Sequence, residues 1–268
     1  MIIQKNTPIE NYLINGREVF VKREDLSSLP PAPALAKLRG VYNFLEGLKE
    51  KGINKFGVYD TRLSKAGWGC SAVANEIGGI EIINFYPDLK EYNHKTPENQ
   101  SKVLELGHKV YGLKGGRTAI LYARAKKIMK EMQAYPMPMG LVLKETVEEV
   151  SIEAKTIDEK YLGGDLIVCV GTGMILAGII KGIGNKFNRI YGISAGMNIE
   201  KQKKRIKSVI EEIPDNVEFI MSEKDYYYED FIVTPFPCSP YYDKKAYRWM
   251  IKNLKYLKDT ILFWNIGV

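Results

Sequence analysis

Short apolar runs alternate with stretches of helical periodicity along most of the 268-residue chain. Apolar runs bounded by turn-forming residues predict strands, whereas apolar residues three and four positions apart predict amphipathic helices. Strands are expected at 18–22, 55–59, 81–85, 109–112, 166–170, 189–193 and 260–263. Helices are expected at 36–51, 69–77, 97–106, 118–132, 147–161, 174–183, 199–212 and 243–257. This alternation is typical of an α/β protein with largely parallel sheets.

A segment rich in proline and methionine, residues 135–141 (YPMPMGL), separates two stretches of this alternation. Such residues indicate a turn or a crossing between structural units. We therefore expect one catalytic unit, 1–268, in which a smaller subdomain, about 41–135, is inserted into a larger one, 1–40 plus 136–268. Because ligands of open α/β sheets bind at the carboxyl ends of the strands, a cleft between the two sheets is the expected ligand site.

Composition narrows the class of protein and its compartment. The hydrophobic content of 45% is that of an ordinary globular protein. The three cysteines are far apart and form no CxxC pair, so we expect neither a disulfide framework nor a bound metal. No run approaches the roughly 18 apolar residues of a membrane span, and the N-terminal residues lack a leader pattern. The sequence predicts a cytoplasmic protein without membrane contact.

The net charge of +7 has a local concentration in residues 201–207 (KQKKRIK). Its basic residues are Lys201, Lys203, Lys204, Arg205 and Lys207. Such a run is either a solvated helix face or a surface that attracts an anionic partner such as nucleic acid. No zinc finger, basic zipper or RNA-binding aromatic motif accompanies it, so the solvated face is the preferred interpretation.

The segment with the clearest chemical meaning is the strand 166–170 (LIVCV), which runs into Gly171, Thr172 and Gly173 and then into the helix 174–183. Glycine lets the backbone approach a ligand closely, and the N–H groups and dipole of a following helix favour a phosphate. The alternative is a tight turn whose small residues serve packing alone. Neither a P-loop nor a complete G-x-G-x-x-G motif is present.

Residues 21–25 (VKRED) end a strand, and Lys37 follows in the segment ALAKLRG at the start of a helix. This order resembles the fold-type II pyridoxal-phosphate (PLP) enzymes, the tryptophan synthase β-like family that includes 1-aminocyclopropane-1-carboxylate deaminase and D-cysteine desulfhydrase. In that family a KRED strand precedes a G-G-N-K-x-R-K-like motif whose lysine holds the cofactor. The resemblance implies two parallel-sheet subdomains with helices on both faces, with PLP in the cleft as a Schiff base of Lys37.

Three further stretches extend the resemblance almost to the end of the chain. Residues 61–74 (TRLSKAGWGCSAVA) match a loop that binds the substrate carboxylate, which implies substrate contacts by Ser64, Lys65, Ala66, Gly67 and Trp68. Residues 170–178 match the phosphate cup, which implies cofactor contacts by Gly171, Thr172, Gly173, Met174 and Ile175. Residues 239–246 (SPYYDKKA) and 262–267 (LFWNIG) resemble the closing motifs, which implies that Tyr242 is an active-site tyrosine and that Asp243 faces the pyridine nitrogen.

The lysine motif departs from the family pattern in two ways. The glycine pair before the lysine is replaced within residues 33–36 (PALA), and the asparagine expected after Ser64 is Lys65. Lys65 is therefore an alternative to Lys37 as the lysine of the Schiff base. The order and spacing with VKRED favour Lys37.

The cup and the closing motif depart as well. Met174 and Ile175 stand where the family has glycine and threonine, so one hydroxyl contact to the phosphate is lost. Asn265 and Ile266 replace a histidine and a threonine. The tyrosine run 226–228 is either an aromatic lid, a substrate-stacking surface, or ordinary packing or surface exposure, and the last is the preferred interpretation.

The resemblance implies chemistry at the α-carbon of an amino acid, because the protonated cofactor ring withdraws electrons from that atom. Asp243 would keep the ring nitrogen protonated, Lys37 would be the acid or base, and Tyr242 a second one. The expected function is elimination, deamination or decarboxylation, through a quinonoid carbanion, of a small amino-acid-like substrate. One alternative is a viral DNA-hypermodification enzyme in the host cytoplasm, acting on an amino acid attached to a thymine base. Another is a catalytically silent binding scaffold; a homodimer is implied only by the family.

Overall fold

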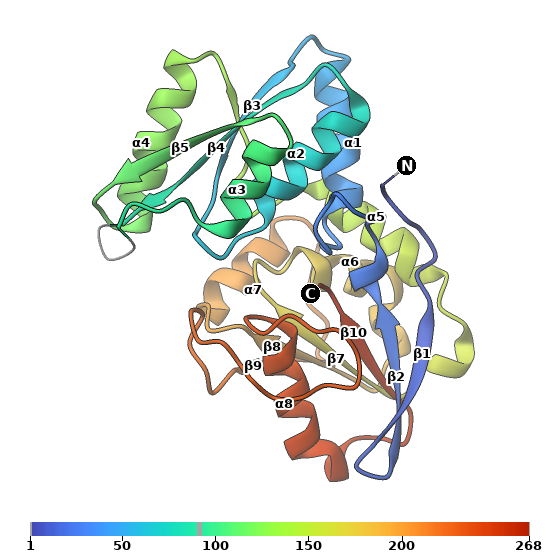
Figure 1. The fold of residues 1–268 in the computed structure, drawn as a ribbon. Helices are drawn as coiled ribbons and strands as arrows, with labels where there is room; N and C mark the ends of the chain where they lie inside the picture. The colour runs from blue at the N-terminus through green and yellow to red at the C-terminus, as the bar shows by residue number, and fades with distance from the viewer. Residues whose placement is uncertain (1, 90–92, 268) are drawn as a thin grey trace. The chain divides into compact units, whose positions relative to one another are not determined.

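The computed structural model describes residues 2–89 and 93–267, which form two compact units, each with its own sheet (Figure 1). Unit 1 comprises residue 2, Pro30–Pro33 and the described part of Val41–Leu143. Unit 2 comprises Ile3–Leu29, Ala34–Gly40 and residues 144–267. The segment 135–141 lies within unit 1, and the chain passes to unit 2 after Leu143.

Unit 1 is built on a four-stranded parallel sheet of order β5-β4-β3-β6. Its strands are β3 (Lys55–Tyr59), β4 (Glu81–Asp88), β5 (Lys109–Lys114) and β6 (Tyr135–Pro136). Its helices are α2 (Ala66–Ile77), α3 (Glu98–Glu105) and α4 (Thr118–Glu131), together with most of α1 (Leu38–Lys49). Figure 1 shows α2 and α3 on one face of this sheet and α4 on the other. The α4 face buries Phe85, Leu121 and Met129, which form the core of the unit on that side.

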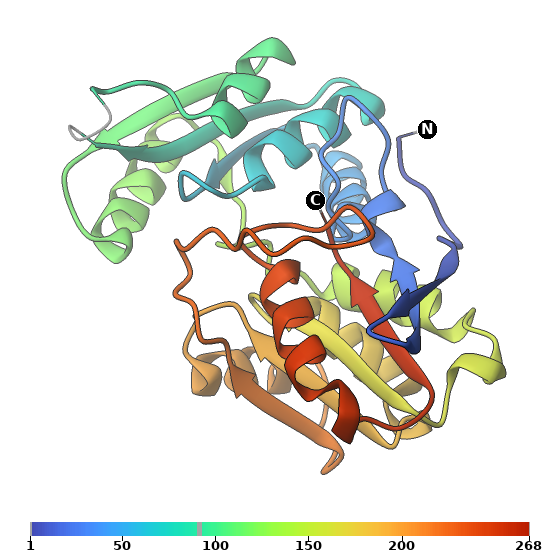
Figure 2. The same cartoon turned by 60° about the horizontal axis from the view of Figure 1, so that its bottom comes forward.

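Unit 2 contains a six-stranded sheet of order β1-β2-β10-β7-β8-β9, in which only β1 runs antiparallel to its neighbour. The strands are β1 (Ile9–Ile14), β2 (Arg17–Arg23), β7 (Asp165–Val170), β8 (Arg189–Ser194), β9 (Val217–Met221) and β10 (Ile261–Asn265). The helices are α5 (Lys144–Lys155), α6 (Met174–Ile183), α7 (Ile199–Lys207) and α8 (Asp243–Asn253). Short 3₁₀ turns are η1 (Glu24–Leu26), η3 (Glu159–Tyr161), η4 (Gly184–Lys186) and η5 (Leu254–Tyr256). Figure 2 shows α8 on one face of the sheet and α5 and α6 on the other.

Five of these six strands are parallel, so their carboxyl ends meet at one edge of the unit 2 sheet. The chain leaves β2 there at Glu24, β7 at Gly171 and β10 at Ile266. This is the edge at which open α/β sheets bind their ligands. Segments that are far apart in the sequence thus come together at one place.

The expected α/β fold with parallel sheets is confirmed. Each predicted strand overlaps an observed one, whereas β1, β6 and β9 were not predicted. β1 and β9 are edge strands of unit 2 with many exposed or half-buried residues, so their apolar pattern is weak. The helix expected over 199–212 ends at Lys207, and the helix expected over 147–161 is replaced by α5 and η3.

Helices α5 and α6 pack closely at Gly178, and this contact gives a first testable prediction. A Cβ atom at Gly178 would lie 2.5 Å from the Cβ of Val150 on α5. We expect Gly178→Ala to lower the free energy of unfolding by about 1–3 kcal/mol, because the helices must shift to admit the methyl group. Denaturant unfolding measures the change. In the matched variant Gly47→Ala on α1, where the new Cβ meets nothing within 4 Å, we expect a gain of roughly 0.5–1 kcal/mol. Equal stability of Gly178→Ala and the wild type would contradict the packing.

Candidate active site

The carboxyl edge of the unit 2 sheet places Lys37 against the glycine loop that follows β7. Lys37 immediately precedes α1 and is partly buried. Its Nζ donates a hydrogen bond to Oγ1 of Thr172 at 2.9 Å. The N–H of Ala36 donates to the carbonyl oxygen of Ile266, just after β10. The end of the chain thus holds the lysine segment in place beside the loop.

The Lys37 amine has altered acidity. Burial lowers its pKa from 10.5 to about 8, and the positive charge of Arg205 adds to this effect. A lysine reacts with an aldehyde only as the neutral amine, so a lowered pKa makes the reactive form available near neutral pH. This is the property needed in a lysine that forms a Schiff base.

The glycine loop is shaped to present backbone N–H groups at the start of α6. Gly173 has φ +100°, a left-handed conformation that favours glycine, and it forms the N-cap of α6 without a side-chain cap. Nε2 of Gln202 on α7 donates to the carbonyl oxygens of Val170 (2.8 Å) and Gly171 (2.9 Å). Carbonyl groups of the loop are thereby held by α7, while the helix N-terminus with its positive dipole end suits an anion. Met174 and Ile175, which follow, are buried apolar side chains.

Asp243 is the first residue of α8 and is almost completely buried. Its Oδ1 accepts a hydrogen bond from the N–H of Ile266 at 3.0 Å. Burial raises the pKa of Asp243 to about 7; the charge of Asp25 acts in the same direction, and the Ile266 hydrogen bond opposes them. A carboxyl group with this pKa is poised to exchange a proton with a ring nitrogen near neutral pH.

Tyr242, the residue before Asp243, lies beside the glycine loop. Its ring approaches Gly171 closely enough that a Cβ there would lie 3.6 Å from it. Its hydroxyl group shares a 2.7 Å hydrogen bond with the hydroxyl group of Tyr226, and the two rings meet edge to face. Tyr226 was not predicted as a site residue. The only sequence signal was the tyrosine run, which we interpreted as packing.

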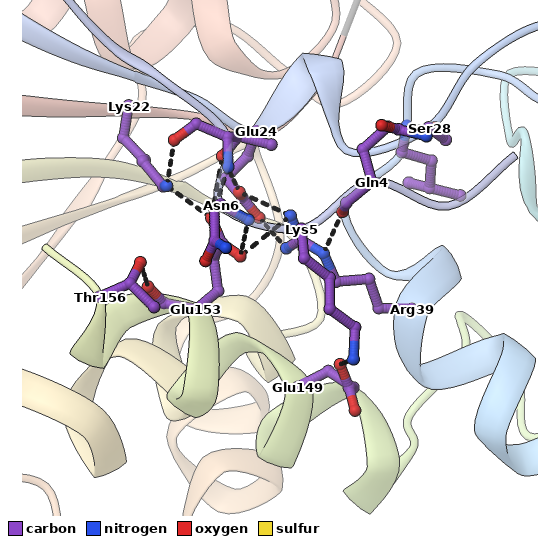
Figure 3. Close-up of polar contacts among 12 residues, drawn as sticks. Gln4, Lys5, Asn6, Lys22, Glu24, Ser28, Arg39, Glu149, Glu153 and Thr156 are labelled. Carbon is purple, nitrogen blue, oxygen red and sulfur yellow. Dashed lines mark hydrogen bonds and ion pairs between the residues drawn. The ribbon is translucent and has the colours of Figure 1, made fainter. Parts of the chain in front are cut away.

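Lys22 and Glu24 of the VKRED motif belong to a buried network of charged side chains, which Figure 3 shows. Nζ of Lys22 lies 2.6 Å from Oε1 of Glu153 on α5. Arg39, two residues after Lys37, donates to Glu24 at 2.7 and 3.1 Å and lies 3.4 Å from Glu153. Because these side chains are at most 3% exposed, the network fixes the start of α1 to β2 and α5.

Arg23 and Asp25, the other charged residues of the motif, connect the end of β2 to Asn265 at the end of β10. Arg23 donates to both oxygens of Asp25 at 2.9 and 2.8 Å. Nδ2 of Asn265 donates to Oδ1 of Asp25 at 2.9 Å and to the carbonyl oxygen of Pro237 at 2.8 Å. Asn265 stands where the resembled motif has a histidine, and here its amide group joins three segments of unit 2.

The loop that precedes α2 belongs to unit 1, and its donors bind a carboxylate of the chain itself. Oγ of Ser64 and the N–H of Gly67 each donate to Asp60 at 2.6 Å, and Nδ2 of Asn84 donates to it at 2.9 Å. Burial raises the pKa of Asp60 to about 6, although the hydrogen bonds it accepts favour the charged form. Asp60 follows β3 directly, and sequence reasoning did not identify it.

Three further predicted substrate residues lie at the start of α2. Lys65 is the partly exposed N-cap of α2, and the N–H of Ala66 donates to Oγ of Ser64 at 3.1 Å. Nε1 of Trp68 donates to the carbonyl oxygen of Pro31 at 2.8 Å, also within unit 1. Unit 2 thus brings together the predicted lysine, cup, tyrosine and aspartate, and unit 1 carries the predicted substrate loop.

Among the described residues, no helix is long and apolar enough to cross a membrane.

The unit 2 site fits PLP in three respects: an amine of lowered pKa, a glycine loop at a helix N-terminus, and a buried carboxyl group. These residues are Lys37, Gly171–Gly173 and Asp243.

The fold is that of solved PLP enzymes. O-ureido-L-serine synthase aligns with a TM-score of 0.73 and 12% identity, covering 98% of this chain and 89% of that one. Serine racemase from Dictyostelium discoideum gives a TM-score of 0.66 and 15% identity, with coverage of 98% and 91%. O-acetylserine dependent cystathionine β-synthase from Helicobacter pylori gives 0.66 and 17%, with coverage of 100% and 96%. The class is therefore the tryptophan synthase β-like fold, fold type II, as predicted.

Sequence similarity defines the family more closely. The chain is 33% identical over 283 residues to the glycyl-dTMP PLP-dependent decarboxylase of Pseudomonas phage M6, covering 99% of this chain and 100% of that protein. No protein-family model matches. The chain belongs to the family of this phage PLP-dependent enzyme, and the predicted membership of the fold-type II PLP enzymes is confirmed.

Proposed function

We propose that this protein is a PLP-dependent decarboxylase that acts on a glycine-derived group carried by a thymidine nucleotide. The observation that carries the proposal is the 33% sequence identity to the phage glycyl-dTMP decarboxylase, which extends over the full length of that protein. It is supported by the Lys37 amine and the glycine loop, which lie together in unit 2. Enzymes of this fold perform many reactions, so the fold alone would not select decarboxylation.

Bound PLP would supply an electron sink that lets a bond at the α-carbon break. Lys37 would hold the cofactor, and its amine, with a pKa of about 8, could return a proton to the α-carbon after the carboxyl group leaves as CO2. Asp243 would hold a proton at the ring nitrogen, where its own raised pKa of about 7 permits sharing. Tyr242, fixed by Tyr226, would limit the space beside the loop.

The loop before α2 supports decarboxylation over reactions that retain the carboxylate. The resemblance assigns this loop to the substrate carboxylate, yet its Ser64 hydroxyl and Gly67 N–H already donate to Asp60. A second carboxylate at this helix N-terminus would meet the charge of Asp60, and like charges in a buried site repel. An arrangement that does not hold the substrate carboxylate suits an enzyme that must release it.

The proposal is tested with the purified full-length protein loaded with PLP. We expect loss of the carboxyl group as CO2 from a thymidine monophosphate that carries the glycine-derived group on its base. Isotopically labelled substrate allows CO2 to be counted, and mass spectrometry of the nucleoside identifies the product. The same group placed in duplex DNA shows whether the protein acts before or after polymerisation.

Free glycine, serine and D-cysteine serve as comparison substrates in the same assay. Turnover of a free amino acid, with none of the nucleotide in either form, would refute the nucleotide substrate. Release of ammonia or pyruvate in place of CO2 would refute decarboxylation.

A further inference from the structure

The glycine loop is covered by α7, the helix that carries the basic run. Gln202 donates to the carbonyl oxygens on both sides of the β7 end, and Cγ1 of Ile206 lies 2.8 Å from where a Cβ of Gly173 would be. Residues three and four apart lie on one side of a helix. Arg205 follows Gln202 by three positions and therefore belongs to the side of α7 that faces the loop.

Arg205 differs from the other basic residues of α7. Lys201, Lys204 and Lys207 are exposed, and Lys203 pairs with Glu200 at 3.2 Å. Arg205 is half-buried, and its guanidinium group has no ion-pair partner among residues 2–89 and 93–267. Its charge is close enough to Lys37 to act on the acidity of that amine.

Two cationic groups near one another and beside a helix N-terminus repel, and an anion bound between them would offset this repulsion. The loop itself offers few side-chain donors to such an anion. Ile175 provides no hydroxyl group, which leaves the hydroxyl of Thr172, the acceptor of the Lys37 hydrogen bond, as the one side-chain hydroxyl donor within residues 171–175. A guanidinium group can supply two parallel hydrogen bonds and a full charge to a phosphate.

We propose that Arg205 binds the phosphate group of the cofactor at the Gly171–Gly173 loop, where it takes over the contact that Ile175 cannot make. The proposal concerns PLP binding, which the assay of decarboxylation does not test, so the two can fail separately. A nucleotide substrate also carries phosphate, and the experiment distinguishes the two sources.

The experiment measures the dissociation constants of PLP and of pyridoxal, which lacks the phosphate, by absorbance titration of the full-length apoprotein. Loss of a charged hydrogen bond predicts that Arg205→Gln weakens PLP binding by about 10- to 100-fold. Removing Arg205 also changes the charge near Lys37, but this should change the affinities of PLP and pyridoxal for Lys37 by the same factor. The ratio of their two dissociation constants therefore isolates the phosphate contact. Arg205→Lys, which keeps the charge, should give an intermediate ratio.

Lys204→Gln is the matched control, because it removes the same charge from the neighbouring exposed position. It should leave the ratio of PLP to pyridoxal affinity unchanged. Inorganic phosphate should compete with PLP for the wild type and compete less well for Arg205→Gln. An unchanged ratio of the two constants in Arg205→Gln, including the case in which PLP and pyridoxal lose affinity equally, would overturn the proposal. Unchanged PLP binding with weakened binding of thymidine monophosphate would assign Arg205 to the substrate instead and would also overturn it.

Discussion

Replacement of Lys37 by alanine is expected to abolish both catalysis and the covalent attachment of PLP. The side chain is the amine of lowered pKa that lies against the glycine loop. Loss of a group that forms a covalent bond in the reaction commonly lowers turnover by a factor on the order of 10³ or more. Borohydride reduction followed by peptide mass spectrometry measures attachment, and the decarboxylation assay measures turnover.

Lys65→Ala is the control for this prediction, because Lys65 is the alternative lysine in the sequence. It lies at the N-cap of α2 and is partly exposed. We expect the reduced cofactor to remain on Lys37 in this variant. Attachment that survives in Lys37→Ala and disappears in Lys65→Ala would exchange the roles of the two lysines and would refute our assignment.

The sequence predicted the fold well where elements are buried and regular. β7 is buried at all six positions, and α6 has apolar residues around most of its surface, so both were placed almost to the residue. The strands it missed lie at sheet edges or, in the case of β6, consist of two residues. Edge strands have one partner and one open side, so their pattern depends on tertiary pairing that a single sequence does not show.

The candidate site was reached from the order of motifs, and the roles of its residues stay predictions. Motif order pointed to Lys37, the glycine loop and Asp243. The pKa values of Lys37 and Asp243 are shifted by burial, which only the fold reveals. Sequence reasoning did not single out Asp60 and Tyr226, because an isolated aspartate after a strand and a tyrosine in a run carry no motif. Asp60 is bonded by side chains 4 and 24 residues away, and Tyr226 by one 16 residues away.

The VKRED motif pointed to the family by sequence order alone, and the structure shows what its charged residues do. The sequence showed only that it ends a strand, and in the structure its charged residues Lys22, Arg23, Glu24 and Asp25 are all buried in unit 2. A buried charge is tolerated only when it is paired and hydrogen-bonded. The partners come from segments far along the chain, so the motif sets the position of the lysine segment through contacts made with α1, α5 and β10.

The second large effect is expected from breaking this network at Glu153. Glu153→Gln removes the charge that faces Lys22, whose side chain is only 2% exposed and would remain a buried cation without its carboxylate. We expect the free energy of unfolding to fall by about 3–5 kcal/mol, the usual effect of leaving one member of a buried pair uncompensated. Chemical denaturation followed by circular dichroism measures this change.

The converse variant, Lys22→Met, should lower the free energy of unfolding by less. In Lys22→Met, Glu153 keeps Arg39 at 3.4 Å and the N–H groups of Asn6 and Thr7 at 2.9 and 2.8 Å. We expect a loss of about 1–3 kcal/mol, that of a hydrogen bond to a charged group. A larger loss in Lys22→Met than in Glu153→Gln would contradict the view that the unpaired lysine is the main source of destabilisation.

The pH dependence provides an independent check on the same network. Burial opposes the charged form of Glu153, but the hydrogen bond from Lys22 and the charges of Arg39 and Lys22 outweigh it, so its pKa in the folded protein is lowered from 4.5. A carboxyl group with a depressed pKa stabilises the fold above its unfolded-state pKa and loses this contribution as the pH falls through the folded value. The difference in stability between wild type and Glu153→Gln should therefore be full at neutral pH and shrink progressively below about pH 4.5. A difference that stays constant down to strongly acidic pH would show that the effect of the substitution comes from packing and not from charge.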